Sequence, residues 1–197
     1  GEVDTVYLGC WRREAFERFG PFDEDLVRAQ DSEFNLRIWR RGGRVWQTPR
    51  ARSWYRPRNR LRDLFRQYAQ YGYWKVATLK KHRLPASWRQ LVPGAFVGGM
   101  LTLGALGVFD PRWLVLAGLL AMLYAGGCAA AAATLCRRSG RWDLFPLLPP
   151  VFAAFHFGFG YGYWRGLLDF FVLRRRARPA FARLTRPSAP AQGQRAA

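Results

Sequence analysis

The sequence predicts a mixed α/β segment at the N-terminal end, followed by α-helical membrane segments. Residues 1–58 combine short stretches of alternating apolar residues with stretches of helical spacing, whereas residues 91–173 contain long runs almost free of charge. Half of the 197 residues are hydrophobic and 16% are aromatic. This composition excludes a disordered basic chain.

Residues 1–58 carry the strand and helix patterns. Three stretches have the alternation of strands: residues 3–8, 44–49 and 53–55. Two have apolar side chains at helical spacing and end at a Gly-Pro or Gly-Gly pair: residues 11–19 and 31–41. A segment this short cannot hold a complete core of alternating strands and helices, so we expect it to be part of a larger domain.

Residues 59–90 are predicted to form a basic amphipathic helix at the membrane interface. Its apolar stripe consists of Leu61, Leu64, Phe65, Tyr68 and Tyr71, and arginines and lysines supply the other side. Such a helix can lie in the lipid headgroup plane with its apolar face down. A helix that packs on the neighbouring domain with a solvated basic edge has the same pattern, and both interpretations stay open.

The predicted membrane region, residues 91–173, contains three apolar runs: residues 91–109, 113–136 and 144–173. The first two are uncharged and long enough to span a bilayer. The excess of Lys and Arg in cytoplasmic loops places both the basic segment before Leu91 and residues 137–141 on the cytoplasmic side, which two spans satisfy. By the same rule a third span would place Arg174 outside, so the last run is either re-entrant or interfacial, or it spans against the rule. Residues 174–197 are predicted to be a basic disordered tail that touches anionic lipid.

Two features of the third run are notable. Gly158, Gly162 and Gly166 have the small-residue spacing of a helix contact face. His156 is a polar residue at apparent membrane depth, which indicates either a functional group or a packed histidine bonded to a carbonyl.

The net charge of +19 indicates an anionic partner. Because the uncharged runs serve no purpose in a soluble nucleic-acid binder, we expect anionic membrane lipid and no nucleic acid. The three cysteines have neither the number nor the spacing of a disulfide framework or a zinc site. The first residues lack the pattern of a signal peptide, and we expect them to continue a longer chain.

Several short motifs follow one another in a fixed order: residues 4–9, 12–16, 20–24, 30–37, 55–58 and 66–75. In this order they resemble the acceptor-side half of family 2 glycosyltransferases, and the last motif resembles the succinoglycan-type exopolysaccharide branch. The resemblance covers about residues 3–173. It implies that the α/β segment is the acceptor-side part of a GT-A fold, in an inverting, membrane-bound glycosyltransferase that uses a nucleotide-sugar donor.

Asp31 corresponds to the general base of that family. A carboxylate within hydrogen-bond distance can take the proton that an acceptor hydroxyl loses as it attacks the anomeric carbon. The family has Glu-Asp here, whereas this chain has Gln30-Asp31. Losing the neighbouring charge makes ionisation of Asp31 easier. The alternative is that Asp31 only caps the helix over residues 31–41.

A second motif of the family, Gln-x-x-Arg-Trp, corresponds to residues 67–71, with Gln70 and Tyr71 in place of Arg and Trp. Aromatic rings stack on sugars, amides bind hydroxyl or phosphate oxygens, and Arg58 and Arg66 are cations that can replace the missing arginine. The expected acceptor- and donor-binding residues are Gln30, Arg58, Arg66, Gln67, Gln70 and Tyr71. The missing arginine favours transfer of a single sugar over processive polymerisation.

The family also uses a divalent metal, Mg or Mn. Asp23 and Asp25 have the letters of an Asp-x-Asp metal motif, but the motif of the family lies upstream. We therefore expect no metal site in this chain. Both the metal site and the nucleotide-binding half of the enzyme are expected in a segment before Gly1.

The hypothesis is a glycosyltransferase at the inner (plasma) membrane, with its catalytic part in the cytoplasm. It transfers a sugar to a lipid-linked or polysaccharide acceptor, and the 197 residues alone are inactive. The alternative is a non-catalytic basic membrane protein that binds anionic lipid or nucleic acid.

Overall fold

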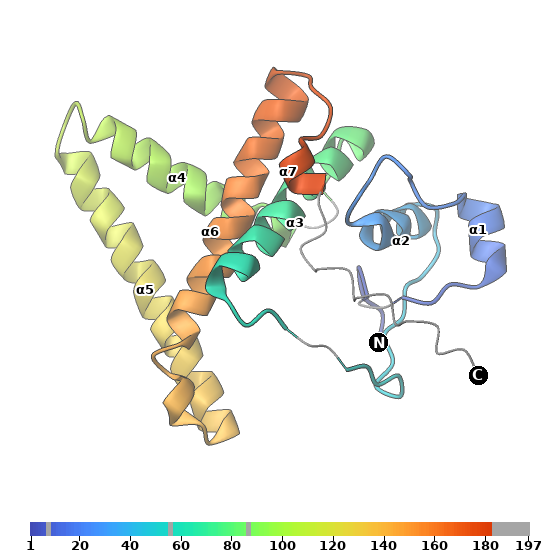
Figure 1. Ribbon diagram of the computed structural model, residues 1–197, viewed down its shortest axis with the longest axis horizontal. Coiled ribbons are helices and arrows are strands. Elements are labelled where there is room, and N and C mark those ends of the chain that lie inside the picture. The colour runs from blue at the N-terminus through green and yellow to red at the C-terminus, as the bar shows by residue number, and fades with distance from the viewer. Residues whose placement is uncertain (7–8, 55–56, 86–87, 183–197) are drawn as a thin grey trace, which may run out of the picture.

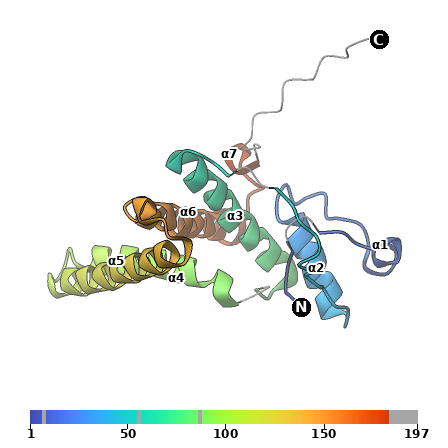
Figure 2. The ribbon, with the colours of Figure 1, turned by 90° about the horizontal axis from the view of Figure 1, so that it is seen from below.

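The computed structural model describes residues 1–6, 9–54, 57–85 and 88–182, and most of these residues are helical (Figure 1). The elements are α1 (Arg13–Phe19), α2 (Gln30–Arg40), α3 (Leu61–His82), η1 (Trp88–Gln90), α4 (Val92–Leu106), α5 (Arg112–Ser139), η2 (Trp142–Leu144), α6 (Leu148–Leu167), η3 (Leu168–Val172) and α7 (Pro179–Ala182). Helix α3 lies between α6 on one side and α2 on the other (Figures 1 and 2).

The expected α/β fragment of a GT-A fold is wrong for the described part of the chain, which has no strand longer than an isolated bridge. Strands were predicted over residues 3–8, 44–49 and 53–55. Among the described residues there is one antiparallel bridge, which joins Glu2, just before the first stretch, to Trp46 in the second. Residues 7, 8 and 55 lie outside the described part. The reason is that the alternating apolar side chains are buried by helices instead of a sheet. Val3 and Val45 pack against Phe19 of α1 and Phe34 of α2.

The two predicted N-terminal helices are confirmed as α1 and α2. Helix α1 ends at Gly20, whose positive φ of 83° suits glycine. Phe34 of α2 is fully buried, with the rings of Trp11, Phe16 and Phe22 at centroid distances of 5.6, 4.9 and 5.3 Å. This aromatic cluster joins α1 to α2 without a sheet.

Helix α3 crosses α6 at the predicted glycine face. A Cβ atom at Gly158 would lie 2.7 Å from the Phe65 carbonyl oxygen, and one at Gly162 would overlap the Ala69 carbonyl oxygen. From the side of α3, a Cβ at Gly72 would overlap the Phe159 carbonyl oxygen. The contact face is therefore confirmed, and its partner is the basic amphipathic helix. That helix packs on protein along this face; whether it also lies in a headgroup plane stays a prediction.

Of the three expected membrane segments, the structure supports one. Among the described helices only α5, with 28 residues, is long and apolar enough to cross a membrane, and none of its most apolar stretch is buried in the protein. Helix α4 has only 15 residues. Helix α6 has 20 residues and buries its glycines against α3 and α4. Spans were expected at residues 91–109 and 113–136, and the first is not supported because α4 is too short. Whether residues 144–173 span or are re-entrant stays a prediction.

The chain returns over α3 after η3. The Phe181 ring of α7 stacks on Tyr73 at a centroid distance of 4.2 Å, and Trp74 Nε1 donates to the Phe181 carbonyl at 3.0 Å. The buried Asp169 carboxylate accepts hydrogen bonds from the Tyr73 hydroxyl at 3.1 Å and from Arg178 Nε at 2.7 Å. Part of the expected disordered tail is thus packed, and residues 183–197 lie outside the described part.

Candidate functional site

Asp31 lies in the first turn of α2, where the helix faces α3. Ala29 is the N-cap, in a left-handed conformation with φ 63°, and no side chain caps the helix. Asp31 is therefore not at the N-cap position. Its half-buried carboxylate nevertheless accepts a hydrogen bond at 2.7 Å through Oδ1 from the backbone N–H of Ser32 in the first turn, so a helix-capping role stays the alternative to the general base. A negative charge at this end of a helix is favoured by the helix dipole.

Lys75 of α3 reaches the same turn of α2. Its Nζ donates a hydrogen bond to the Ser32 hydroxyl. Burial lowers the pKa of the Lys75 ammonium, whereas the negative charges of Asp31 and Asp4 raise it. Sequence reasoning counted Lys75 only as part of a cationic helix face. The available signal was its spacing of four residues from Tyr71, which places the two side chains on one side of α3.

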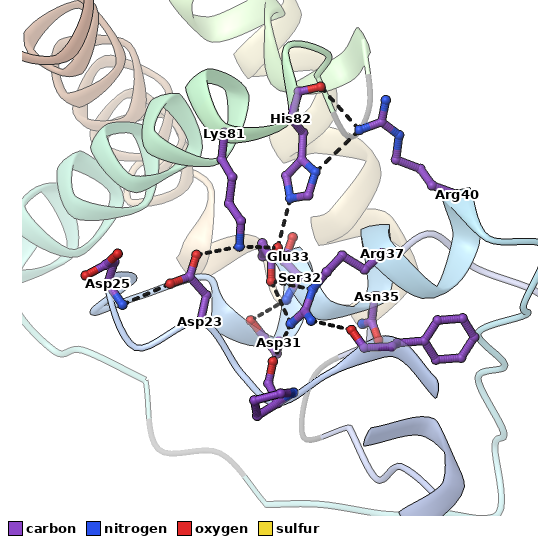
Figure 3. A network of polar contacts seen from close by, with 12 residues as sticks. Asp23, Asp25, Asp31, Ser32, Glu33, Asn35, Arg37, Arg40, Lys81 and His82 are labelled. Carbon is purple, nitrogen blue, oxygen red and sulfur yellow. Dashed lines mark hydrogen bonds and ion pairs between the residues drawn. The ribbon is translucent and has the colours of Figure 1, made fainter. Parts of the chain in front are cut away.

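Glu33 anchors α2 to the end of α3 through the contacts drawn in Figure 3. It is fully buried. Its carboxylate accepts hydrogen bonds from Arg37 Nε at 3.0 Å and Lys81 Nζ at 2.9 Å, and His82 Nε2 lies 2.8 Å away. Burial raises the pKa of Glu33, but the hydrogen bonds from Lys81 and His82 and the charge of Arg37 outweigh it, so the pKa lies below its usual value. The network holds α2, and therefore Asp31, against α3.

The Asp-x-Asp letters belong to the same anchor. Asp23 Oδ2 accepts a hydrogen bond from Lys81 Nζ at 2.6 Å, and Asp23 Oδ1 accepts one from the Asp25 backbone N–H at 2.9 Å. Within the described ranges no three His, Cys, Asp or Glu side chains are grouped to hold a metal ion. The residues described do not fit a divalent metal, and the metal expected upstream of Gly1 stays a prediction.

Some of the predicted binding residues are close together. Gln67 Nε2 donates to the Tyr71 hydroxyl at 2.8 Å on α3. Burial lowers the pKa of the Arg28 guanidinium, Tyr71 raises it and the like charge of Arg58 lowers it further, so these three groups are neighbours. Arg28, just before α2, is a cation that sequence reasoning missed.

The other predicted residues differ in burial and contacts. Gln30 is half-buried at the first position of α2, and Arg66 is exposed on α3. Gln70 is buried and donates from Nε2 to the Ala180 carbonyl at 3.4 Å, so it faces the returning C-terminal segment. His156 Nδ1 lies 3.0 Å from the Tyr124 hydroxyl of α5 instead of a carbonyl.

This arrangement, an acid on one helix beside a helix of amide, phenol and ammonium groups, suits a site for polar ligands such as sugars and phosphates. The resemblance to glycosyltransferases of the exopolysaccharide branch is confirmed by homologues. The chain is 33% identical over 166 residues, 81% of its length, to the succinoglycan biosynthesis protein ExoA of Rhizobium meliloti. It is 26% identical over 147 residues, 75% of its length, to the dolichyl N-acetyl-alpha-D-glucosaminyl phosphate 3-beta-D-2,3-diacetamido-2,3-dideoxy-beta-D-glucuronosyltransferase of Methanococcus voltae.

The chain spans less than half the length of either relative, 46% of the first and 41% of the second. No model of a protein family matches it. No solved structure matches it either. The activities of the whole relatives therefore reach this chain only as a proposal.

Proposed function

We propose that the protein containing this chain is a membrane-bound, inverting glycosyltransferase with Asp31 as its general base. It transfers a sugar from a nucleotide-sugar to a lipid-linked or polysaccharide acceptor. The observation that carries the proposal is the 33% identity with a succinoglycan biosynthesis protein over 81% of the chain. The name of the second relative, a transferase acting on a dolichyl-linked sugar phosphate, favours a lipid-linked acceptor.

In this mechanism the acceptor hydroxyl attacks the anomeric carbon from the face opposite the nucleoside diphosphate. The new C–O bond forms as the bond to the diphosphate breaks, and the configuration at that carbon inverts. The hydroxyl proton passes to the Asp31 carboxylate, which general-base catalysis requires within hydrogen-bond reach. In the proposed site Gln67 and Tyr71, which are hydrogen-bonded to each other, would bind sugar or phosphate oxygens, and Arg28 and Arg58 would offer positive charge to a phosphate.

The proposed location is the inner (plasma) membrane, with Asp31 on the cytoplasmic side. Exposed α5, the one helix in the described part of the chain that is long and apolar enough to span, supports membrane association. Anionic lipid is the expected partner of the basic surface. Mg or Mn remains the expected cofactor, with ligands outside the described residues.

The test uses the full-length protein in membranes, with radiolabelled nucleotide-sugars and extracted lipid-linked acceptors. Asp31→Asn is expected to lower transfer by about 10²–10⁴-fold, the usual contribution of a general base. Asp25→Asn is the matched control, because Asp25 is exposed and lies outside the α2–α3 contacts, and it should keep wild-type activity. Both variants should stay in the membrane fraction.

Wild-type activity in Asp31→Asn would show that Asp31 is not the base. Absence of transfer by the wild-type protein with every donor, together with salt-sensitive binding to phosphatidylglycerol vesicles, would instead support a non-catalytic lipid-binding protein. The anomeric configuration of the product, read by NMR, tests inversion.

A further inference from the structure

We propose that Lys75 is the positioning residue of Asp31: its ammonium fixes the first turn of α2 on α3 and supplies the positive charge that faces the carboxylate. This inference rests on the proposed function, because it concerns how the proposed base is presented.

Ser32 connects the two charged groups. Its hydroxyl accepts the hydrogen bond of Lys75 Nζ, and its backbone N–H donates to Asp31 Oδ1 at 2.7 Å. Ser32 is buried and Lys75 is half-buried, so the contact lies inside the α2–α3 junction. The Lys75 side chain therefore holds the backbone unit that carries Asp31.

The charges around the ammonium come from two other elements. Asp31 belongs to α2, and Asp4 belongs to the N-terminal segment. The Asp4 carboxylate is itself paired with Arg89 at 3.6 Å, which ties part of its charge to η1. Of these two carboxylates, Asp31 is the one on α2, the helix that Lys75 contacts through Ser32. The opposite charges of Asp31 and Lys75 stabilise each other.

The choice of lysine supports a specific role. The chain has three lysines among its 32 basic residues, and two of them, Lys75 and Lys81, bind α2 from α3. An ammonium is a compact charge with three donors, so it can approach a small serine hydroxyl that a planar guanidinium would not fit as well. Burying an amine costs free energy unless an opposite charge compensates it. The negative charge of Asp31 is part of what compensates the burial of the Lys75 ammonium.

The first test reads the Lys75–Asp31 interaction without any activity. The full-length protein is labelled with [ε-¹³C]lysine, and Lys75→Met assigns the side-chain NMR signal of Lys75 by its disappearance. Asp31→Asn is expected to lower the titration midpoint of Lys75 by about one pH unit, as loss of a close opposite charge does. Asp25→Asn should leave it in place, and exposed Lys80 serves as the internal reference. If the titration midpoint of Lys75 is the same in Asp31→Asn as in the wild type, the proposal is overturned.

The second test uses the full-length enzyme. Lys75→Met is expected to reduce kcat about tenfold or more, with a smaller change in KM, because the first turn of α2 loses its support. Lys75→Arg should restore part of kcat. Lys80→Met, on the same helix, is the matched control and should behave as wild type.

The outcomes separate the two proposals. Loss of stability in Lys75→Met with an unchanged kcat of the folded enzyme would show a merely structural tether and overturn the positioning role. Full transfer by Asp31→Asn would overturn Asp31 as the base, while the NMR titration still decides whether Lys75 and Asp31 interact.

Discussion

Replacing Gly162 by alanine will destabilise the protein, because α6 meets α3 there without room for a methyl group. The added Cβ would overlap the carbonyl oxygen of Ala69. A backbone oxygen inside a helix cannot rotate away as a flexible side chain can. Helices α3 and α6 must therefore separate, which also loosens the packing of Gly158 and Gly166 on α3.

The magnitude follows from two opposing contributions. Alanine is favoured over glycine inside a helix by about 1 kcal/mol. Overpacking costs ~1–3 kcal/mol, and contact with backbone atoms places Gly162→Ala at the upper end of that range. We expect a net loss of about 2 kcal/mol in the free energy of unfolding, which corresponds to a melting temperature lower by about 4–8 °C for a chain of this size.

The assay is thermal unfolding in detergent micelles, followed by far-ultraviolet circular dichroism. Gly127→Ala in α5 is the matched control, because no atom lies within 4 Å of the Cβ built at that position. It should keep or raise the melting temperature. If Gly162→Ala melts at or above the temperature of Gly127→Ala, the close crossing of α3 and α6 is refuted.

Glu33→Gln is expected to cost about 3–5 kcal/mol of stability in chemical denaturation, because it leaves the buried cations around it without their charge partner. Because the folded pKa of Glu33 lies below its ordinary value of 4.5, its contribution is present above pH 4.5 and is lost as the pH falls through the folded pKa; an acid titration of stability should show this loss in the wild type and not in Glu33→Gln. Tyr73→Phe removes a donor from buried Asp169 at a cost of about 1–3 kcal/mol, and chymotryptic cleavage at Phe181 should become faster in mass spectrometry. Met122→Arg on the exposed surface of α5 should disfavour membrane insertion by about 2.5–3.5 kcal/mol, measured with an insertion reporter; equal insertion of the wild type and the variant would contradict a span at α5.

Elements that depend on residues close together in the chain were predicted correctly from the sequence. Helices α1 and α2 follow from the spacing of apolar residues and from the glycines that end them. The glycine face of α6 was predictable from its spacing, but its partner was not. The strand predictions were wrong because alternating apolar residues indicate only that one side of a segment is buried. The pattern around Val3 and Val45 does not say whether a sheet or a helix covers that side.

In the candidate site, too, the residues that are contiguous in the chain were predicted, and those brought together by folding were not. The motif around Asp31 is contiguous in the chain and was recognised there. Lys75 joins it from 43 residues away, and its burial exists only once α2 has docked on α3. Arg28 beside Arg58 and Tyr71 likewise depends on folding of distant segments, since no spacing in the sequence brings them together.

Helix α3 is packed on two sides. The glycines of α6 contact one side, and on the other side Lys75 and Lys81 contact α2. With 22 residues it is about 33 Å long. A rod held in this way passes movement from one end to the other. With α5 in a bilayer, a change in lipid thickness that tilts the packed helices would also shift Asp31 relative to the lipid surface. Membrane thickness would then become a mechanical input to sugar transfer.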